Sequence, residues 1–255
     1  MGGLVLALAS PARAQSAEPV LPTPAETPPV NEAACPVNAE SIVLAADGLA
    51  RTRAAVARGK VTILAVGSSS IAGWGASAYE RGFVPLLQTD LRRRLPGVQV
   101  DVVNRGVGGE TARETVDRLG KELADHRPDL VIWQVGTNDV MRARPWNDVA
   151  ADMQRGEAVL TAAAVDVLLI DPQRLPPDEV NVNTRGRNAQ LGEAARMIAL
   201  EGDRVGYAVQ RRFDAMAAWT RLTRGGVGPD DLHLNDEGYA CWAAITGEAL
   251  AAALR

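Results

Sequence analysis

Two short segments of this sequence contain serine, histidine and aspartate residues that could support nucleophilic chemistry. The chain has only two histidines, His126 and His233, and it has three adjacent serines at positions 68–70. A serine hydroxyl becomes a good nucleophile when a base removes its proton, and histidine is the usual base near neutral pH. An acid, Asp230, precedes His233 by three residues. These residue types are those of a Ser–His–Asp site.

The two histidines lie in different sequence surroundings. His126 stands at the end of a predicted helix and just before Arg-Pro, where histidine commonly caps backbone carbonyls, so we interpret it as structural. His233 lies in a polar, acidic segment, where the carboxylate of Asp230 can fix the ring tautomer. Asp231 is a second acid nearby. The alternative interpretation is that this segment, with Asn235, only caps the final helix.

Other kinds of site find little support in the sequence. Two histidines and two cysteines, Cys35 and Cys241, without CxxC spacing argue against a metal site. The phosphate-binding pattern GxxxxGK[ST] does not occur, and the glycines at 106–109 do not fit GxGxxG. We therefore expect no metal and no nucleotide cofactor.

The apolar residues predict the elements that position these side chains. Continuous apolar runs, each typical of a strand buried on both faces of a parallel sheet, occupy residues 61–66, 98–103, 130–135 and 165–170. Helical spacing occupies residues 39–60, 82–95, 111–125 and 147–163. The predicted fold class is α/β, a three-layer α/β/α sandwich with a parallel sheet of about five strands.

Polar, glycine-rich segments follow the predicted strands. They occupy residues 67–71, 104–111 and 136–139, and a fourth segment at 230–238 precedes the last helix. In a parallel sheet the ligand crevice lies beyond the carboxyl ends of the strands. We therefore expect the four segments to meet in one crevice.

Four segments of this form and order resemble those of the SGNH (GDSL-type) hydrolases, over residues 62–239. The resemblance implies a flavodoxin-like fold and a metal-free, two-step ester hydrolysis. By position in the family pattern, Ser69 is the nucleophile, ahead of Ser70 and Ser68. His233 is the base and Asp230 orients it, as the DxxH spacing of the family implies. The sequence departs from the family in having Ser68 where Asp is usual and Ser70 where an aliphatic residue is usual.

The same resemblance implies the donors that stabilise an oxyanion. They are the backbone N–H of Ser69, the backbone N–H of Gly109 and the side-chain amide of Asn138. Donors aimed at the developing negative charge are a general need of acyl-transfer sites. The alternative is a plain strand-to-helix turn at the glycines and an Asx-turn at Asn138.

Substrates in the family are carboxylic esters, including carbohydrate O-acetyl groups, short acyl esters, lysophospholipids and thioesters. The sequence has no long insertion that would form a lid, which favours small or polymer-borne acyl groups. Trp74, Trp146 and Arg105 lie near the polar segments and are candidate substrate contacts, although packing is the commoner role of such residues. Trp133 lies inside a predicted strand. Residues 171–177 follow the fourth strand and are a candidate rim of the crevice.

An esterase is the activity that we predict, and two alternatives remain open. An acyltransferase would use the same triad and differ only in the acceptor that resolves the acyl-enzyme. A non-catalytic module that binds carbohydrate or assists envelope assembly would need no working nucleophile, and Ser68 would then mark the drift of that loop.

Composition limits the class of protein. The chain has 255 residues, 47% of them apolar and 23% charged, which suits one domain plus a tail. A net charge of −4 with a pI near 5.3 argues against nucleic acid as a partner. No apolar run is long enough for a membrane span. The sequence does not predict an oligomeric state.

The first part of the chain predicts export. Residues 1–14 combine a short apolar run with an Ala-Arg-Ala site and are predicted to be a signal peptide, although no positive charge precedes the run. Residues 15–38 form a proline-rich tether, and 39–255 form the hydrolase domain. The predicted location is periplasmic or secreted. In an oxidising compartment Cys35 and Cys241 would tend to form a disulfide, and two unrelated thiols are the alternative.

Overall fold

The computed structural model describes residue 35, residues 42–43 and residues 48–255. The predicted signal peptide at 1–14 and nearly all of the predicted tether at 15–38 lie outside the described residues, so both stay predictions.

A six-stranded sheet forms the centre of the molecule, in the order β1-β6-β5-β4-β2-β3. Five strands are parallel, and the short β1 pairs antiparallel with β6 at one edge. The bounds are β1 (Ile42–Val43), β2 (Lys60–Gly67), β3 (Gln99–Gly106), β4 (Leu130–Gln134), β5 (Asp166–Ile170) and β6 (Ala208–Gln210). The five parallel strands follow the flavodoxin-like order, which confirms the predicted fold class.

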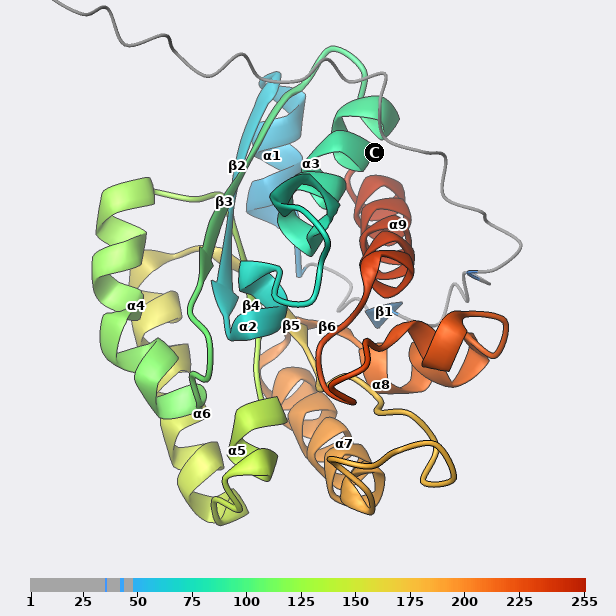
Figure 1. The fold of residues 1–255 in the computed structure, drawn as a ribbon. Coiled ribbons are helices and arrows are strands. Elements are labelled where there is room, and N and C mark those ends of the chain that lie inside the picture. Colours follow the sequence, from blue (N-terminus) through green and yellow to red (C-terminus); the bar gives the residue numbers. More distant parts are fainter. Residues whose placement is uncertain (1–34, 36–41, 44–47) are drawn as a thin grey trace, which may run out of the picture.

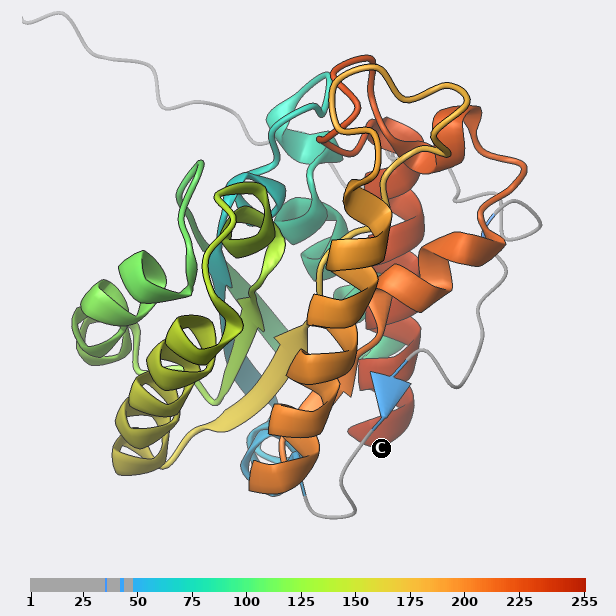
Figure 2. The same ribbon diagram turned by 90° about the horizontal axis from the view of Figure 1, so that it is seen from below.

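Helices cover both faces of the sheet, as Figures 1 and 2 show. One layer contains α1 (Ala50–Ala57), α3 (Phe83–Arg94) and α9 (Asp236–Ala253), and the other contains α4 (Ala112–His126), α6 (Trp146–Ala163) and α7 (Arg187–Val205). Short helices complete the described chain: α2 (Ser69–Ala72), η3 (Tyr79–Arg81), α5 (Thr137–Met141), α8 (Arg212–Ala215), η4 (Met216–Ala218) and η5 (Thr223–Gly226).

Each face of the sheet has its own hydrophobic core. Ile63 and Ile132 point to the α3–α9 side, where Phe83 and Trp242 stack with their ring centroids 3.6 Å apart. The neighbouring residues on the same strands belong to the opposite core, where Trp133 is 1% exposed. Burial on both faces explains the apolar sequences of β2 and β4. The prediction of burial on both faces was wrong for residues 98–103, because β3 lies at the edge of the sheet and alternates the buried Val100 and Val102 with more exposed residues.

The first predicted helix was wrong in its extent. The sequence predicted a helix over residues 39–60, but Ile42–Val43 forms β1 and the helix α1 covers only Ala50–Ala57. Two adjacent β-branched residues favour extended backbone. Their pairing with Val209 and Gln210 extends the sheet past β6.

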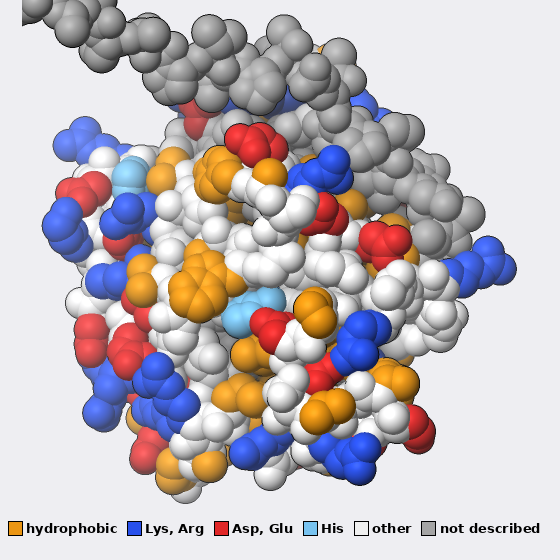
Figure 3. All heavy atoms as spheres, in the orientation of Figure 1, with side chains coloured by type: hydrophobic (Ala, Val, Ile, Leu, Met, Phe, Trp, Pro, Cys, Tyr) orange, Lys and Arg blue, Asp and Glu red, His pale blue; other side chains and the backbone are white. Residues whose placement is uncertain are grey.

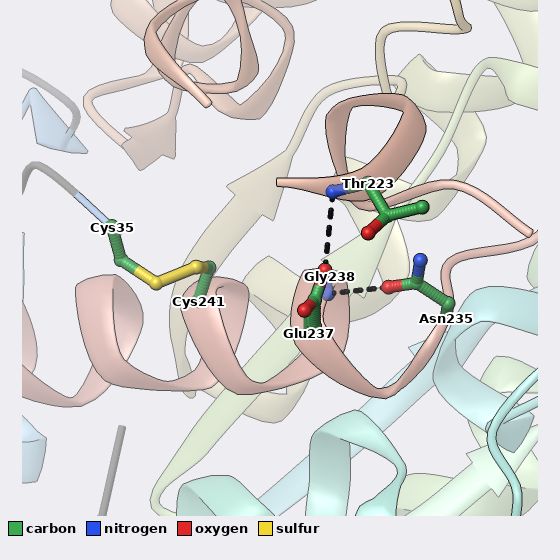
Figure 4. The surroundings of a disulfide bond; sticks show 6 residues. All are labelled: Cys35, Thr223, Asn235, Glu237, Gly238 and Cys241. Atoms are coloured by element: carbon green, nitrogen blue, oxygen red, sulfur yellow. Dashed lines mark hydrogen bonds between the residues drawn. A yellow bond between two sulfur atoms is a disulfide. The ribbon is translucent and has the colours of Figure 1, made fainter. Parts of the chain in front are cut away.

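A disulfide joins Cys35 to Cys241 of α9, in agreement with the predicted pairing (Figure 4). The two Cα atoms are 5.3 Å apart, and the bridge spans 206 positions of sequence. Both cysteines are almost fully buried. The bridge therefore joins position 35 covalently to the last helix.

Among the described helices, none has the length and apolarity that crossing a membrane requires.

Candidate active site

The turn between β2 and α2 carries the three serines. Gly67 ends β2 with φ of +141°, and a Cβ at this position would lie 2.6 Å from the carbonyl oxygen of Gln134. A side chain here would therefore clash with the neighbouring strand. This glycine lets the chain leave the sheet sharply, so that Ser69 begins α2 at the carboxyl end of β2, between the strands β3 and β4.

Ser69, His233 and Asp230 form one hydrogen-bonded line. The Ser69 Oγ lies 3.0 Å from the Nε2 of His233, and the opposite ring nitrogen, Nδ1, lies 2.5 Å from the Oδ2 of Asp230. The serine and the histidine are 164 positions apart in the sequence. The fold thus brings together all three residues that the sequence predicted as a triad.

Three hydrogen bonds hold the carboxylate of Asp230. Its Oδ1 accepts hydrogen bonds from the backbone N–H groups of Leu232 and His233, and its Oδ2 faces the His233 ring. Partial burial acts to raise the pKa of Asp230, but the hydrogen bonds from the His233 ring and the two backbone amides outweigh it and hold the pKa below its ordinary value. The carboxylate is therefore ionised at neutral pH and favours a proton on Nδ1.

Ser68 and Ser70 have different surroundings from Ser69. The Ser68 hydroxyl donates to Gln134 Oε1 at 2.8 Å, and its backbone N–H donates to the same oxygen at 3.1 Å. Ser70 is 1% exposed, whereas Ser69 is 7% exposed. Of the three serines, Ser69 is the one with a hydrogen bond to His233.

A buried chain of polar side chains connects the turn at residues 67–70, the serine turn, to the loop at residues 227–235, the histidine loop. Beyond Gln134, Thr137 Oγ1 donates to Gln173 Oε1 at 3.0 Å, and Gln173 Nε2 donates to the carbonyl of Leu232 at 3.1 Å. Gln134 and Thr137 approach each other at 3.5 Å. Gln173 lies in the predicted rim segment, 171–177. These residues therefore bond to the residue before Ser69 and to the residue before His233.

This buried chain was not predicted from the sequence, although the sequence contains one signal for it. Gln134 is the single polar residue in the apolar run 130–135, and a polar side chain in a strand that is buried on both faces needs a partner. The partners of Gln173 are separated from it by 36 positions at Thr137 and 59 at Leu232, so no local pattern indicates them.

Two of the three predicted oxyanion donors, Gly109 and Asn138, follow β3 and β4, and Asn138 lies in α5. Gly109 has φ of +82°, and its carbonyl accepts from the Arg142 guanidinium at 2.7 Å. The Asn138 side-chain amide donates to the Glu110 carbonyl at 2.9 Å. This bond uses one of the two N–H groups of the amide and so fixes the orientation of the side chain. It also joins α5 to the loop after β3. Glu110 directly follows Gly109, so the bond also holds the two predicted donors near each other.

Asp231 is committed to a structural task. Its Oδ2 accepts from the backbone N–H of Val182 at 2.9 Å and from the backbone N–H and side-chain amide of Asn183, each at 3.0 Å. It also forms an ion pair with Arg224. Asp231 is 1% exposed, and it joins its loop to the segment between β5 and α7. The DxxH spacing, which selects Asp230 rather than Asp231, agrees with this arrangement.

Three other residues that the sequence singled out make contacts that stabilise the fold. Arg105 binds Glu122 through two hydrogen bonds of 2.7 and 2.9 Å. His126 ends α4 and lies 3.4 Å from a carboxylate oxygen of Glu122. Trp146 begins α6 and packs against the core on that side of the sheet. Trp74 differs from these residues, because it is 56% exposed and lies beside His233.

The described residues contain no cluster of three or more His, Cys, Asp or Glu side chains arranged to hold a metal ion.

Comparison with protein families matches residues 34–234 to the non-GDSL lipase-like family. The chain belongs to this family. The match covers β2, the serine turn and the histidine loop, which are the parts that carry the resemblance to SGNH hydrolases. That predicted relationship is therefore confirmed at the level of the family.

Two curated relatives match part of the chain. An arylesterase of Vibrio mimicus is 28% identical over 116 residues, and the esterase TesA of Pseudomonas aeruginosa is 32% identical over 117 residues. Each alignment covers 46% of this chain and 56% of the relative. The chain thus spans little more than half the length of these relatives.

Solved structures share the fold of this member of the non-GDSL lipase-like family. A two-domain esterase active on acetylated mannans has a TM-score of 0.64 at 19% identity, over 85% of this chain and 58% of that one. A lipase/acylhydrolase from Enterococcus faecalis has a TM-score of 0.64 at 24% identity, over 76% and 97% of the two chains. An acetyl xylan esterase has a TM-score of 0.63 at 22% identity, over 74% and 100%.

Proposed function

We propose that the protein is an exported serine esterase that hydrolyses carboxylic esters through an acyl-enzyme. The observation that carries this proposal is the hydrogen-bonded line from Asp230 through His233 to Ser69, with atom separations of 2.5 and 3.0 Å. A base within hydrogen-bond reach of a hydroxyl, itself oriented by a carboxylate, is the geometry of nucleophilic catalysis by serine.

In the first step Ser69 forms a covalent bond to the substrate. With its proton on Nδ1, His233 accepts the hydroxyl proton at Nε2 while Oγ attacks the ester carbonyl carbon. The carbonyl oxygen becomes negative and accepts hydrogen bonds from the backbone N–H groups of Ser69 and Gly109 and from the Asn138 amide. The imidazolium then gives its proton to the alcohol oxygen, the ester C–O bond breaks, and the alcohol leaves.

In the second step water releases the acyl group. His233 takes a proton from a water molecule, whose oxygen attacks the acyl carbon and forms a second tetrahedral intermediate. Nε2 returns that proton to the Oγ of Ser69 as the bond between Oγ and the acyl carbon breaks. The carboxylic acid leaves, and the enzyme regains its starting state. Asp230 stays ionised throughout and stabilises the positive charge on the ring.

The support for an ester substrate comes from the relatives and the family. Both curated relatives are described as esterases. Two proteins of the same fold are described as esterases, one active on acetylated mannans and one an acetyl xylan esterase. Short acyl groups, including O-acetyl groups on carbohydrates, are the substrates that we propose.

Export is supported by the sequence of residues 1–14 and by the cysteine pair. Disulfides persist in oxidising compartments and are rare in the cytosol. A bridge between Cys35 and Cys241 therefore favours a periplasmic or secreted location.

Turnover measurements test the proposed activity. We expect the full chain to release acid from a panel of acyl esters of increasing chain length, with acetyl esters among the best substrates. Ser69→Ala should abolish release, and Ser70→Ala should retain it, because it is Ser69 whose hydroxyl is hydrogen-bonded to the His233 ring. Equal loss in Ser70→Ala, or full activity in Ser69→Ala, would contradict the assignment of the nucleophile.

A further inference from the structure

Trp74 is an exposed aromatic residue beside the candidate triad. Its side chain is 56% exposed, and its ring centroid lies 5.6 Å from that of His233, with the two ring planes tilted by 46°. Figure 3 shows a histidine side chain near the middle of the molecular face, bordered by hydrophobic and acidic side chains. A large indole that remains in water gains little from folding, and this one lies directly beside the candidate base.

The backbone holds Trp74 firmly in this exposed position. Its N–H donates to the Ser69 carbonyl at 3.0 Å, and its carbonyl accepts from the Tyr239 hydroxyl at 2.6 Å. The next residue, Gly75, has φ of +90°, and a Cβ there would lie 2.8 Å from the Cβ of His233. The segment is therefore fixed to the serine turn, to α9 and to the histidine loop at once.

The indole also lies against the loop that carries a predicted oxyanion donor. A Cβ at Gly108 would lie 2.6 Å from Cζ2 of Trp74, so the loop approaches the ring as closely as a glycine allows. Gly108 directly precedes Gly109. The ring thus occupies the edge of the site between the histidine and the oxyanion loop.

The proton transfers define which part of the ester meets this ring. His233 must give its proton to the alcohol oxygen, so that oxygen has to come within hydrogen-bond distance of Nε2. The alcohol portion then extends along the imidazole, and Trp74 is the aromatic ring packed beside it. Trp74 is therefore placed to contact the alcohol portion of a bound ester.

We propose that Trp74 is a stacking platform for a sugar ring, and that the alcohol portion of the substrate is an O-acetylated glycan. This inference rests on the proposed esterase function. The C–H groups on one face of a pyranose carry partial positive charge and suit the negative face of an indole. The sugar hydroxyls would stay in water, which agrees with a ring that is more than half exposed. An aromatic alcohol would gain more from an enclosed apolar slot.

Two measurements on the full chain test this inference. The first is hydrolysis of acetylated xylo- and manno-oligosaccharides of one to five sugars. We expect kcat/KM of the native protein to rise with length, and Trp74→Ala to raise KM for the longer oligosaccharides by about tenfold while kcat changes less. Trp74→Phe, which keeps an aromatic face, should recover most of the loss. Leu200→Ala removes another exposed apolar side chain, on α7, and should leave KM unchanged.

The second measurement is binding without hydrolysis. Calorimetry with acetylated xylotetraose and mannotetraose should show weaker binding to Ser69→Ala/Trp74→Ala than to Ser69→Ala. Unchanged oligosaccharide binding and KM in the Trp74 variants would overturn the inference, as would a loss confined to phenyl acetate, which would indicate an aromatic alcohol. Absence of acid release from every ester would instead contradict the proposed function itself.

Discussion

Gln134 holds Ser68, the residue directly before the candidate nucleophile, through a single oxygen. Gln134 Oε1 accepts the Ser68 hydroxyl at 2.8 Å and the Ser68 backbone N–H at 3.1 Å. The pair links the ends of the adjacent strands β2 and β4. It fixes the turn at the position where the SGNH pattern usually has Asp, and the direction of the Ser69 side chain depends on that turn.

Removal of the Gln134 side chain should impair catalysis more than binding. Gln134→Ala leaves two Ser68 donors without their acceptor and loosens the serine turn, so we expect kcat for a short ester to fall by about 10- to 100-fold with little change in KM. The matched control is Gln88→Ala, because Gln88 Oε1 accepts the Val102 backbone N–H at 2.8 Å, between α3 and β3. Equal kinetic effects in the two variants would reduce the role of Gln134 to general stability.

Loss of the Asn138 amide should act on the transition state. If the second N–H of this amide serves the oxyanion, Asn138→Ala should lower kcat by about 10² to 10³ and leave KM nearly unchanged. Asn188→Ala provides the comparison, since Asn188 also bonds to loop backbone, at Leu175. Activity of Asn138→Ala within twofold of the native protein would remove this residue from the oxyanion hole.

The neighbouring acids Asp230 and Asp231 should give opposite phenotypes. Asp230→Asn loses the charge that orients His233, so we expect kcat to fall by about 10⁴ with the fold retained. Asp231→Asn weakens the bonds to Val182, Asn183 and Arg224, and we expect unfolding to become easier by about 1–3 kcal/mol while most of kcat is kept. Steady-state kinetics and denaturant unfolding distinguish the two. A reversed pattern would assign the catalytic acid to Asp231.

The disulfide should contribute strongly to stability. A bridge across 206 positions restricts the unfolded chain, and the chain-entropy estimate for a loop of this size is about 5 kcal/mol, as an upper value. Cys35→Ser and chemical reduction of the native protein should therefore lower the midpoint of thermal unfolding by similar amounts. Mass spectrometry after alkylation provides the direct measurement. Two thiols that react without prior reduction would show that the bridge is absent.

The regular part of the fold was predictable because burial leaves a clear pattern. The runs at 61–66 and 130–135 match β2 and β4 closely, and the segments that follow them meet at the candidate site. Parallel strands that are buried on both faces are mostly apolar, so these two runs predicted strands.

The parts that were missed depend on contacts between distant residues. The two-residue strand β1 pairs with the edge of β6, and two β-branched residues are too short a signal to distinguish a strand from a turn of helix in the sequence. The bonds of Gln173 to Thr137 and Leu232 arise from the packing of three loops. The motif pattern predicted which side chains meet, but it did not predict what holds them in place.

The central claim is that Ser69 is the nucleophile that His233 activates, and covalent labelling tests it most directly. The full chain is treated with a fluorophosphonate, digested, and examined by mass spectrometry to locate the phosphonylated residue. We expect one label, on Ser69, and its loss in Ser69→Ala and in His233→Ala, because the hydroxyl needs the base to react. A label on Ser68 or Ser70, or labelling that persists without His233, would contradict the account.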